Sequence, residues 1–193
     1  MGQRSQFFKL LNMEEDYSQR IFSIASPICP VEKSTVVDWV AFEDKIGFTF
    51  PADYKSLINL LGTGWFGSSL NFRNPVASRP HLRLCRDQLI EYKIMMSDVA
   101  QDSNVRLYPD DGGMIMLGHM DHHEFLLRPK NQRILCDFVW WDTDAERTTD
   151  LNMSVTQFVH DLYLGLIGES WAEQMRKFFW ENGRFPLFEP VHL

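Results

Sequence analysis

The stretch that decides the fold is Gly113–Trp141, GMIMLGHMDHHEFLLRPKNQRILCDFVWW. It holds three apolar runs, GMIMLG, EFLLR and RILCDFVWW, separated by turn-forming residues at about 119–123 and 129–132. Short apolar runs punctuated by Gly, Asp, Pro and Asn favour strands over helices. The stretch therefore predicts an antiparallel meander of three strands.

Helical patterns precede the meander. Apolar residues recur at helical spacing over about 34–46 and again over 51–61, and a glycine follows each run as a stop signal. Leu70–Phe72 alternates as a short strand does, and Asp87 is placed to cap a third helix through about Met96. We expect two short helices, a strand and another helix in this order.

Two more helices are predicted after the meander. Ser154 and Ser170 each stand three residues before a Gln or Glu, which is the spacing of a capping box at a helix start. The closing FPLFEP, residues 185–190, contains two prolines and must run extended. We expect this tail to pack through Phe185 and Phe188.

Strands grouped among segregated helices indicate an α+β fold, with a mainly antiparallel sheet and helices packed around it. Pro27 and Pro30 interrupt any helix near the start of the chain, so residues 1–33 are predicted to be a helical extension with a linker. The core domain is expected over 34–168, followed by a helix and an extended tail over 169–193.

Composition limits the classes of partner. The chain has 193 residues, with 26 Asp and Glu against 19 Lys and Arg, so the net charge is -7. This charge repels nucleic-acid phosphates and anionic lipids, and it favours a basic protein as partner. No stretch of about 18 apolar residues offers a membrane span. The three cysteines are odd in number and in no metal-binding spacing, which fits a reducing cytoplasm.

The segment LGHMDHHE, residues 117–124, raises a metal-site hypothesis because imidazoles and carboxylates are common metal ligands. It matches part of the His-x-His-x-Asp-His signature of metallo-β-lactamase-type hydrolases, but Leu117 stands where the first ligand belongs. A turn between two strands explains the same residues, so we expect neither catalytic residues nor a metal or other cofactor. The hydrolase alternative would use His119, Asp121, His122 and His123.

A more informative feature is acidic. The segment DFVWWDTDAERTTD, residues 137–150, places carboxylates directly after two tryptophans. Because neighbouring strand residues face opposite sides, one of Trp140 and Trp141 is expected inside and the other outside. An exposed Trp ringed by carboxylates suits a cationic partner. The alternative is a solvated loop with both rings covered by the last helix. The carboxylates of this predicted surface are Asp142, Asp144 and Glu146.

Two further segments are assigned to the same binding surface. Asp110 and Asp111 lie on the loop before the meander, and we expect both acidic loops to leave the sheet near one end as a negative rim. Trp65 lies in GTGWFG, residues 62–67, whose glycines are expected to form a turn. That segment lacks the preceding strand and following helix of a dinucleotide-binding loop.

The segment DWVAFEDKIGFTFPADYKSLINLLGTGWFG, residues 38–67, resembles the opening motif of the SUKH superfamily, also called the Smi/Knr family. In that motif a first helix ends in Gly, an apolar-Pro pair follows, and a second helix carries an early Tyr. The Trp-bearing third strand and the helix that follows it also look like the family core, so the resemblance covers about 34–168. The matching positions of the opening motif are Trp39, Glu43, Gly47, Pro51, Tyr54 and Gly64.

The resemblance implies a SUKH-type fold and a binding function without catalysis. Members are best known as bacterial immunity proteins that bind and silence a toxin, while eukaryotic and viral relatives act as regulators or interaction modules. We therefore expect a non-catalytic module that neutralises a cationic toxin, such as a basic nuclease, by stoichiometric binding. A regulatory or scaffold module of the same fold is the alternative, and a metal-dependent hydrolase is a distant one.

Overall fold

The strands form one antiparallel sheet in the order β6-β5-β4-β3-β2-β1-β7. The computed structural model describes residues 17, 19–21, 23, 37–66, 70–130, 136–168, 172–173 and 188–190. The strands are β1 (Gly64–Phe66), β2 (Leu70–Phe72), β3 (Ile115–Met120), β4 (His123–Pro129), β5 (Cys136–Asp142), β6 (Arg147–Asp150) and β7 (Phe188–Pro190). Together with the helices they make one α+β domain, as the sequence predicted.

The predicted meander is confirmed as β3, β4 and β5. Its first turn is narrower than expected, because only Asp121 and His122 lie between the strands. Asp121 takes the left-handed conformation, with φ +54°, that Asp tolerates better than most residues. The pairing of Met120 with His123 and of His123 with Asp142 places the β3–β4 turn beside the end of β5.

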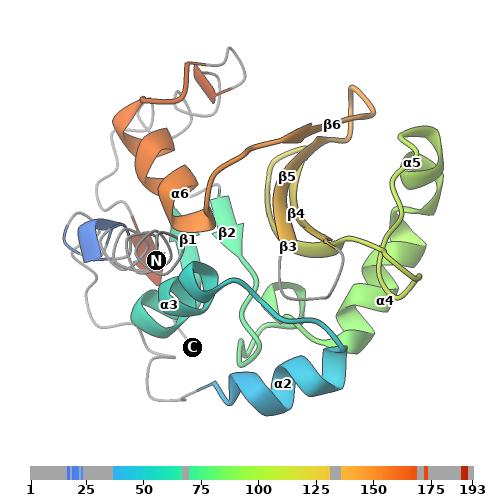
Figure 1. Cartoon of the computed structure of the whole chain (residues 1–193), viewed down its shortest axis with the longest axis horizontal. Coiled ribbons are helices and arrows are strands. Elements are labelled where there is room, and N and C mark those ends of the chain that lie inside the picture. The colour runs from blue at the N-terminus through green and yellow to red at the C-terminus, as the bar shows by residue number, and fades with distance from the viewer. Residues whose placement is uncertain are drawn as a thin grey trace, which may run out of the picture.

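Helices lie on both sides of this sheet (Figure 1). On one side are α3 (Ala52–Leu61) and α6 (Val155–Leu164), and on the other are α4 (Arg86–Met95) and α5 (Ser97–Asp102). The Phe158 ring of α6 packs 5.0 Å from Phe125 and 5.4 Å from Phe138, measured between ring centroids. Both faces of the central strands are therefore covered.

Two of the described helices, α2 and α6, begin with a side-chain N-cap. Asp38 accepts a hydrogen bond from the Ala41 N–H at the start of α2 (Trp39–Ile46), and Gly47 ends this helix with φ +73°. At α6, Ser154 accepts from the Gln157 N–H as predicted. The Gln157 side chain, however, bonds to Asp161 on the next turn and does not complete a capping box.

Other short elements differ from the prediction. The GTGWFG segment forms β1 and not merely a turn, because its backbone pairs with both β2 and β7. Cys85 occupies the N-cap position of α4 without a side-chain hydrogen bond, so Asp87 lies in the first turn and is not the predicted cap. Three short elements were not expected from the sequence: α5, β6 and the 3-10 helix η2 (Pro80–Leu82). None of these three spans more than two turns or four strand residues, so periodicity could not indicate them.

Residues outside the predicted core range also enter the core. Ile21 and Ala172 are buried, and both are helical. Phe188 is buried in β7, which confirms an extended tail there. Phe185 and most of the predicted last helix lie outside the described residues, and the domain boundaries stay predictions. Among the described helices, none has the length and apolar character needed to span a bilayer.

Candidate functional site

The predicted tryptophan anchor is not on the surface. Trp140 and Trp141 do face opposite sides of β5, but both are buried, with exposed fractions of 1% and 0%. The His123 ring lies 5.2 Å from Trp140, and the Arg147 guanidinium lies 5.6 Å from the Trp140 ring. On the other side, Trp141 Nε1 donates to Ser103 Oγ at 3.1 Å, just after α5. The expectation of one exposed Trp is therefore wrong, because α5 covers the second face.

Asp142 also differs from the predicted role of a surface charge. It is buried, and its carboxylate accepts a hydrogen bond from the Ala145 N–H at 3.0 Å. The Arg147 Nη2 lies 3.6 Å from the same carboxylate. These contacts shape the turn between β5 and β6. Asp142 thus stabilises the β5–β6 turn, and its buried carboxylate is not available to a partner.

The exposed acids of this region lie on two hairpin tips. We call Asp121, His122, Asp144 and Glu146 the hairpin-tip surface, which combines the β3–β4 and β5–β6 turns. The Thr143 N–H and hydroxyl both donate to the His122 carbonyl, at 3.3 and 2.7 Å, and join the two tips.

Three carboxylates of this surface are open to solvent. The Asp121 and Asp144 side chains are 53% and 72% exposed, and Glu146 is exposed beside them. The His122 ring approaches Asp121 at 3.4 Å and Asp144 at 3.9 Å, so it lies between the two tips. The surface therefore presents a concentration of negative charge on connected backbone.

Asp110 and Asp111 lie at the other end of the sheet. They precede the start of β3, whereas Asp142 ends β5, and β3 and β5 both run antiparallel to β4. The start of β3 is therefore remote from the end of β5, and the expected common negative rim is wrong. Asp110 moreover pairs with Lys93 at 2.6 Å.

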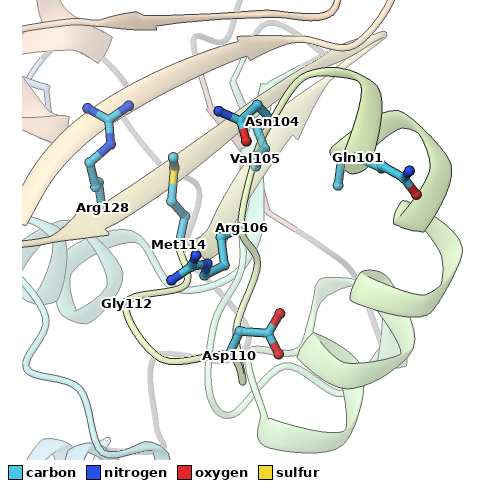
Figure 2. A pocket seen from close by; sticks show the side chains of 9 residues that line it. Gln101, Asn104, Val105, Arg106, Asp110, Gly112, Met114 and Arg128 are labelled. Carbon is cyan, nitrogen blue, oxygen red and sulfur yellow. The ribbon is translucent and has the colours of Figure 1, made fainter.

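A cavity of about 500 Å³ opens beside Asp110, between α5, residues 104–114 and β4 (Figure 2). Its two guanidinium groups are already engaged. Arg106 Nη1 donates to the Asp111 carbonyl at 3.1 Å, and Arg128 pairs with Asp150 at 2.5 Å. The cavity is thus polar but holds no cation that lacks a protein acceptor.

The histidine cluster does not converge on one point. His119 faces the α4 and α5 side with Asn71, whereas His123 faces the opposite side beside Trp140. His122 is exposed at the hairpin tip. Within the part of the chain that the structure describes, no group of three or more His, Cys, Asp or Glu is arranged to hold a metal ion. The turn interpretation explains this placement.

Trp65 belongs to a different region from the acids. It is half-buried in β1, and its ring stands edge-on to His119 with 6.0 Å between centroids. In the strand pairing, Trp65 is opposite Asn71 and Asn71 is opposite His119. On the next strand, Glu124 is opposite His119. These side chains form one row across the sheet, far from the predicted acidic surface in the strand order.

Next to this row is a cluster that the sequence analysis missed. We call Asn71, Arg73, Tyr92 and Glu124 the Arg73 cluster. Arg73 follows β2 and is 7% exposed, and its guanidinium lies 5.6 Å from the Tyr92 ring of α4. Each of the four residues carries at least one buried polar atom without a hydrogen-bond partner in the described structure. They come from β2, α4 and β4, so no sequence spacing indicated them.

Burial strongly affects the acid–base groups here. It raises the pKa of Glu124 to about 7, although Arg73 and Tyr92 oppose the shift. Burial and the charge of Arg73 lower the pKa of His119 to about 4, so this ring is neutral at pH 7. Burial and Glu124 raise the pKa of Tyr92 well above its ordinary value. At neutral pH the cluster therefore holds one cation and a half-ionised carboxyl group.

Comparisons of the chain with protein-family models, with curated proteins and with solved structures found no match.

Proposed function

We propose that this protein is a non-catalytic binding module of the SUKH type that captures a cationic protein through its hairpin-tip surface. The observation that carries the proposal is the exposure of Asp121, Asp144 and Glu146 on two tips that Thr143 joins. Carboxylates held on a connected backbone attract a basic surface without a large ordering cost.

Electrostatics supports a binding role for this end of the molecule. Exposed charges act over a Debye length of about 8 Å at physiological ionic strength, which reaches across an encounter complex. The net charge of -7 adds a long-range attraction for basic partners. The negative potential is concentrated at the hairpin-tip surface. The neighbouring cation Arg147 neutralises it little, because its guanidinium contacts Asp142 and the Trp140 ring.

The SUKH resemblance suggests the biological context. An immunity protein would occlude the active site of a basic toxin, such as a nuclease, by forming a one-to-one complex. A regulatory module of the same fold would use the same surface on another cationic partner. The fold order of helix pair, sheet and closing helix supports the SUKH interpretation, and the hairpin-tip surface supports a cationic partner in either case.

Capture from a native cell lysate tests the proposal. The full chain is immobilised as wild type, as the tip variant (Asp121→Asn, Asp144→Asn, Glu146→Gln), or as a charge-matched control on α2 and α4. Asn and Gln keep the side-chain shapes, and Asn tolerates the positive φ at position 121. The control variant carries Asp44→Asn, Asp87→Asn and Glu91→Gln, which are exposed acids on α2 and α4. Figure 1 shows both helices away from the turn that follows β5.

We expect wild type and control to retain the same basic protein, and the tip variant to lose it. Co-expression of that protein then separates the two contexts, because a toxin arrests growth unless the wild-type chain is present. Equal retention of one basic protein by all three baits would overturn the proposed surface.

A further inference from the structure

Arg73 is a buried cation that forms no ion pair with any of the described residues. Its side chain is 7% exposed, and neither Nε nor Nη1 has a hydrogen-bond acceptor among the described residues. Its guanidinium lies 5.6 Å from the centroid of the Tyr92 ring. Glu124 is the acid with the largest electrostatic influence on Arg73, but no ion pair within 4.0 Å joins the two described side chains. A guanidinium in this position is strongly stabilised by any anion that reaches it.

The neighbours of Arg73 are also incompletely bonded. The Tyr92 hydroxyl faces Glu124 without reaching hydrogen-bond geometry, and Glu124 Oε2 is buried and unbonded. The Asn71 amide nitrogen lies 3.0 Å from a His119 ring nitrogen, but its carbonyl oxygen has no partner in the described structure. Buried polar groups without partners are destabilising, so several of them together point to a partner such as a bound ion.

The composition of the cluster favours an anion as the missing partner. Arg73 supplies N–H donors and Tyr92 supplies an O–H donor. The two side chains are neighbours, because the Arg73 guanidinium packs against the Tyr92 ring. The Tyr54 hydroxyl is already used, because it donates to the Arg73 carbonyl. Planar oxyanions such as carboxylates accept such donors in a fixed arrangement.

We propose that the Arg73 cluster is a binding site for one compact oxyanion, held by the Arg73 guanidinium and the Tyr92 hydroxyl. The carboxyl group of Glu124 regulates this site, because its ionised form competes for Arg73 and repels the guest. The site is independent of the hairpin-tip surface and does not rest on the proposed function. Of the residues around the site, Glu124, His119 and Cys85 are only partly buried.

The pH dependence follows from the groups around Glu124. Arg73 stays a cation, and Tyr92 stays neutral because its pKa is raised well above the ordinary value. His119, with its pKa lowered to about 4, is neutral above pH 6. Glu124 is the member that ionises as the pH passes about 7. The other titratable groups facing the cluster are Tyr54 and Cys85 beside Arg73, and His81 beside His119.

Acetate is the probe for the carboxylate case, since it stays ionised between pH 6 and 8. Its dissociation constant is measured by calorimetry and by thermal shift on the full chain, at ionic strength matched with chloride. We expect saturable binding that weakens about tenfold from pH 6 to pH 8, as Glu124 changes from protonated to ionised. Glu124→Gln should bind at both pH values with the same affinity. Inorganic phosphate at pH 6 is the second arm, and the probe that binds more tightly identifies the natural oxyanion class.

Arg73→Met should lose binding of both probes, and Tyr92→Phe should weaken it several-fold in a protein that still folds. Arg106→Met and Arg128→Met are the controls, because these guanidinium groups lie in the other cavity. The proposal is overturned if wild type shows no saturable binding, or if Tyr92→Phe and wild type bind alike. It is equally overturned if Arg106→Met abolishes binding. Loss of hairpin-tip binding would not affect any of these measurements.

Discussion

Thr143 donates two hydrogen bonds to the His122 carbonyl oxygen, one from its backbone N–H at 3.3 Å and one from its hydroxyl at 2.7 Å. These bonds connect the β5–β6 turn to the β3–β4 turn just beyond His123 and Asp142, the last residue pair between β4 and β5. The acids on both tips are therefore held in one arrangement. A binding surface that is ordered before contact loses little entropy on association.

Replacing Thr143 by Val should remove the hydroxyl bond while keeping the side-chain shape. We expect a loss of about 1 kcal/mol in the free energy of unfolding, as for a typical hydrogen bond. Chemical denaturation measures this change, and hydrogen exchange should show faster opening of both tips. Thr149→Val is the control, because Thr149 is exposed on β6. Equal stability of the two variants would show that the bond does not hold the tips.

Asp142 and Asp144 should differ in their effect on stability although they are two residues apart. Asp142→Ala removes the acceptor of the Ala145 N–H and leaves Arg147 without its carboxylate, so we expect a loss of about 1–3 kcal/mol. Asp144→Ala changes an exposed side chain and should stay within about 0.5 kcal/mol of wild type. Urea unfolding curves of both variants decide this. A neutral Asp142→Ala variant would contradict the supporting role.

Trp141 should matter for folding and not directly for binding. Trp141→Phe removes the hydrogen bond to Ser103 and opens space under α5, so we expect a loss of about 2 kcal/mol. Ser103→Ala is the matched variant and should lose about half as much. The double variant should be less destabilised than the sum, because both residues belong to one bond. Full additivity would argue that the bond contributes nothing.

The meander and the longer helices were predictable because periodicity, caps and stop residues agree there. Ser154 and Gly47 fix helix ends through local hydrogen bonds and backbone conformation, and such features are visible in sequence. In contrast, β1 takes its conformation from pairing with β2 and with β7 near the other end of the chain. Pairing between distant segments leaves no local pattern.

The candidate sites were less predictable than the fold. The alternation of Trp140 and Trp141 follows from strand geometry, but their burial depends on α5, whose six residues show no strong pattern. β3 and β5 both run antiparallel to β4, so Asp110, before β3, and Asp144, after β5, lie at opposite ends of the sheet. The Arg73 cluster joins residues of β2, α4 and β4, which only the tertiary structure brings together.

Glu124 should make stability depend on pH near neutrality. Its folded-state pKa of about 7 lies above the ordinary 4.5, so its contribution is fully present below about pH 4.5 and lost as the pH rises through 7. His119 acts in the opposite sense, because its pKa is lowered from 6.5 to about 4. Its contribution is present above pH 6.5 and lost as the pH falls through 4.

The window from pH 6.5 to pH 8 therefore isolates Glu124. We expect the free energy of unfolding of wild type to fall by about 1 kcal/mol across this window relative to Glu124→Gln. Denaturation at several pH values, in chloride without oxyanions, gives the two profiles. Parallel profiles would mean that Glu124 is ionised in the folded protein throughout this range.

The association rate of the captured basic partner with the wild-type chain, the tip variant and the charge-matched control tests the central claim most directly. The wild-type association rate constant should fall steeply as the ionic strength rises. At low salt the rate constant of the tip variant should be about tenfold lower than that of wild type, and it should depend much less on salt. The control should follow wild type. If the folded tip variant associates as fast as wild type at low salt, the hairpin-tip surface does not capture the partner.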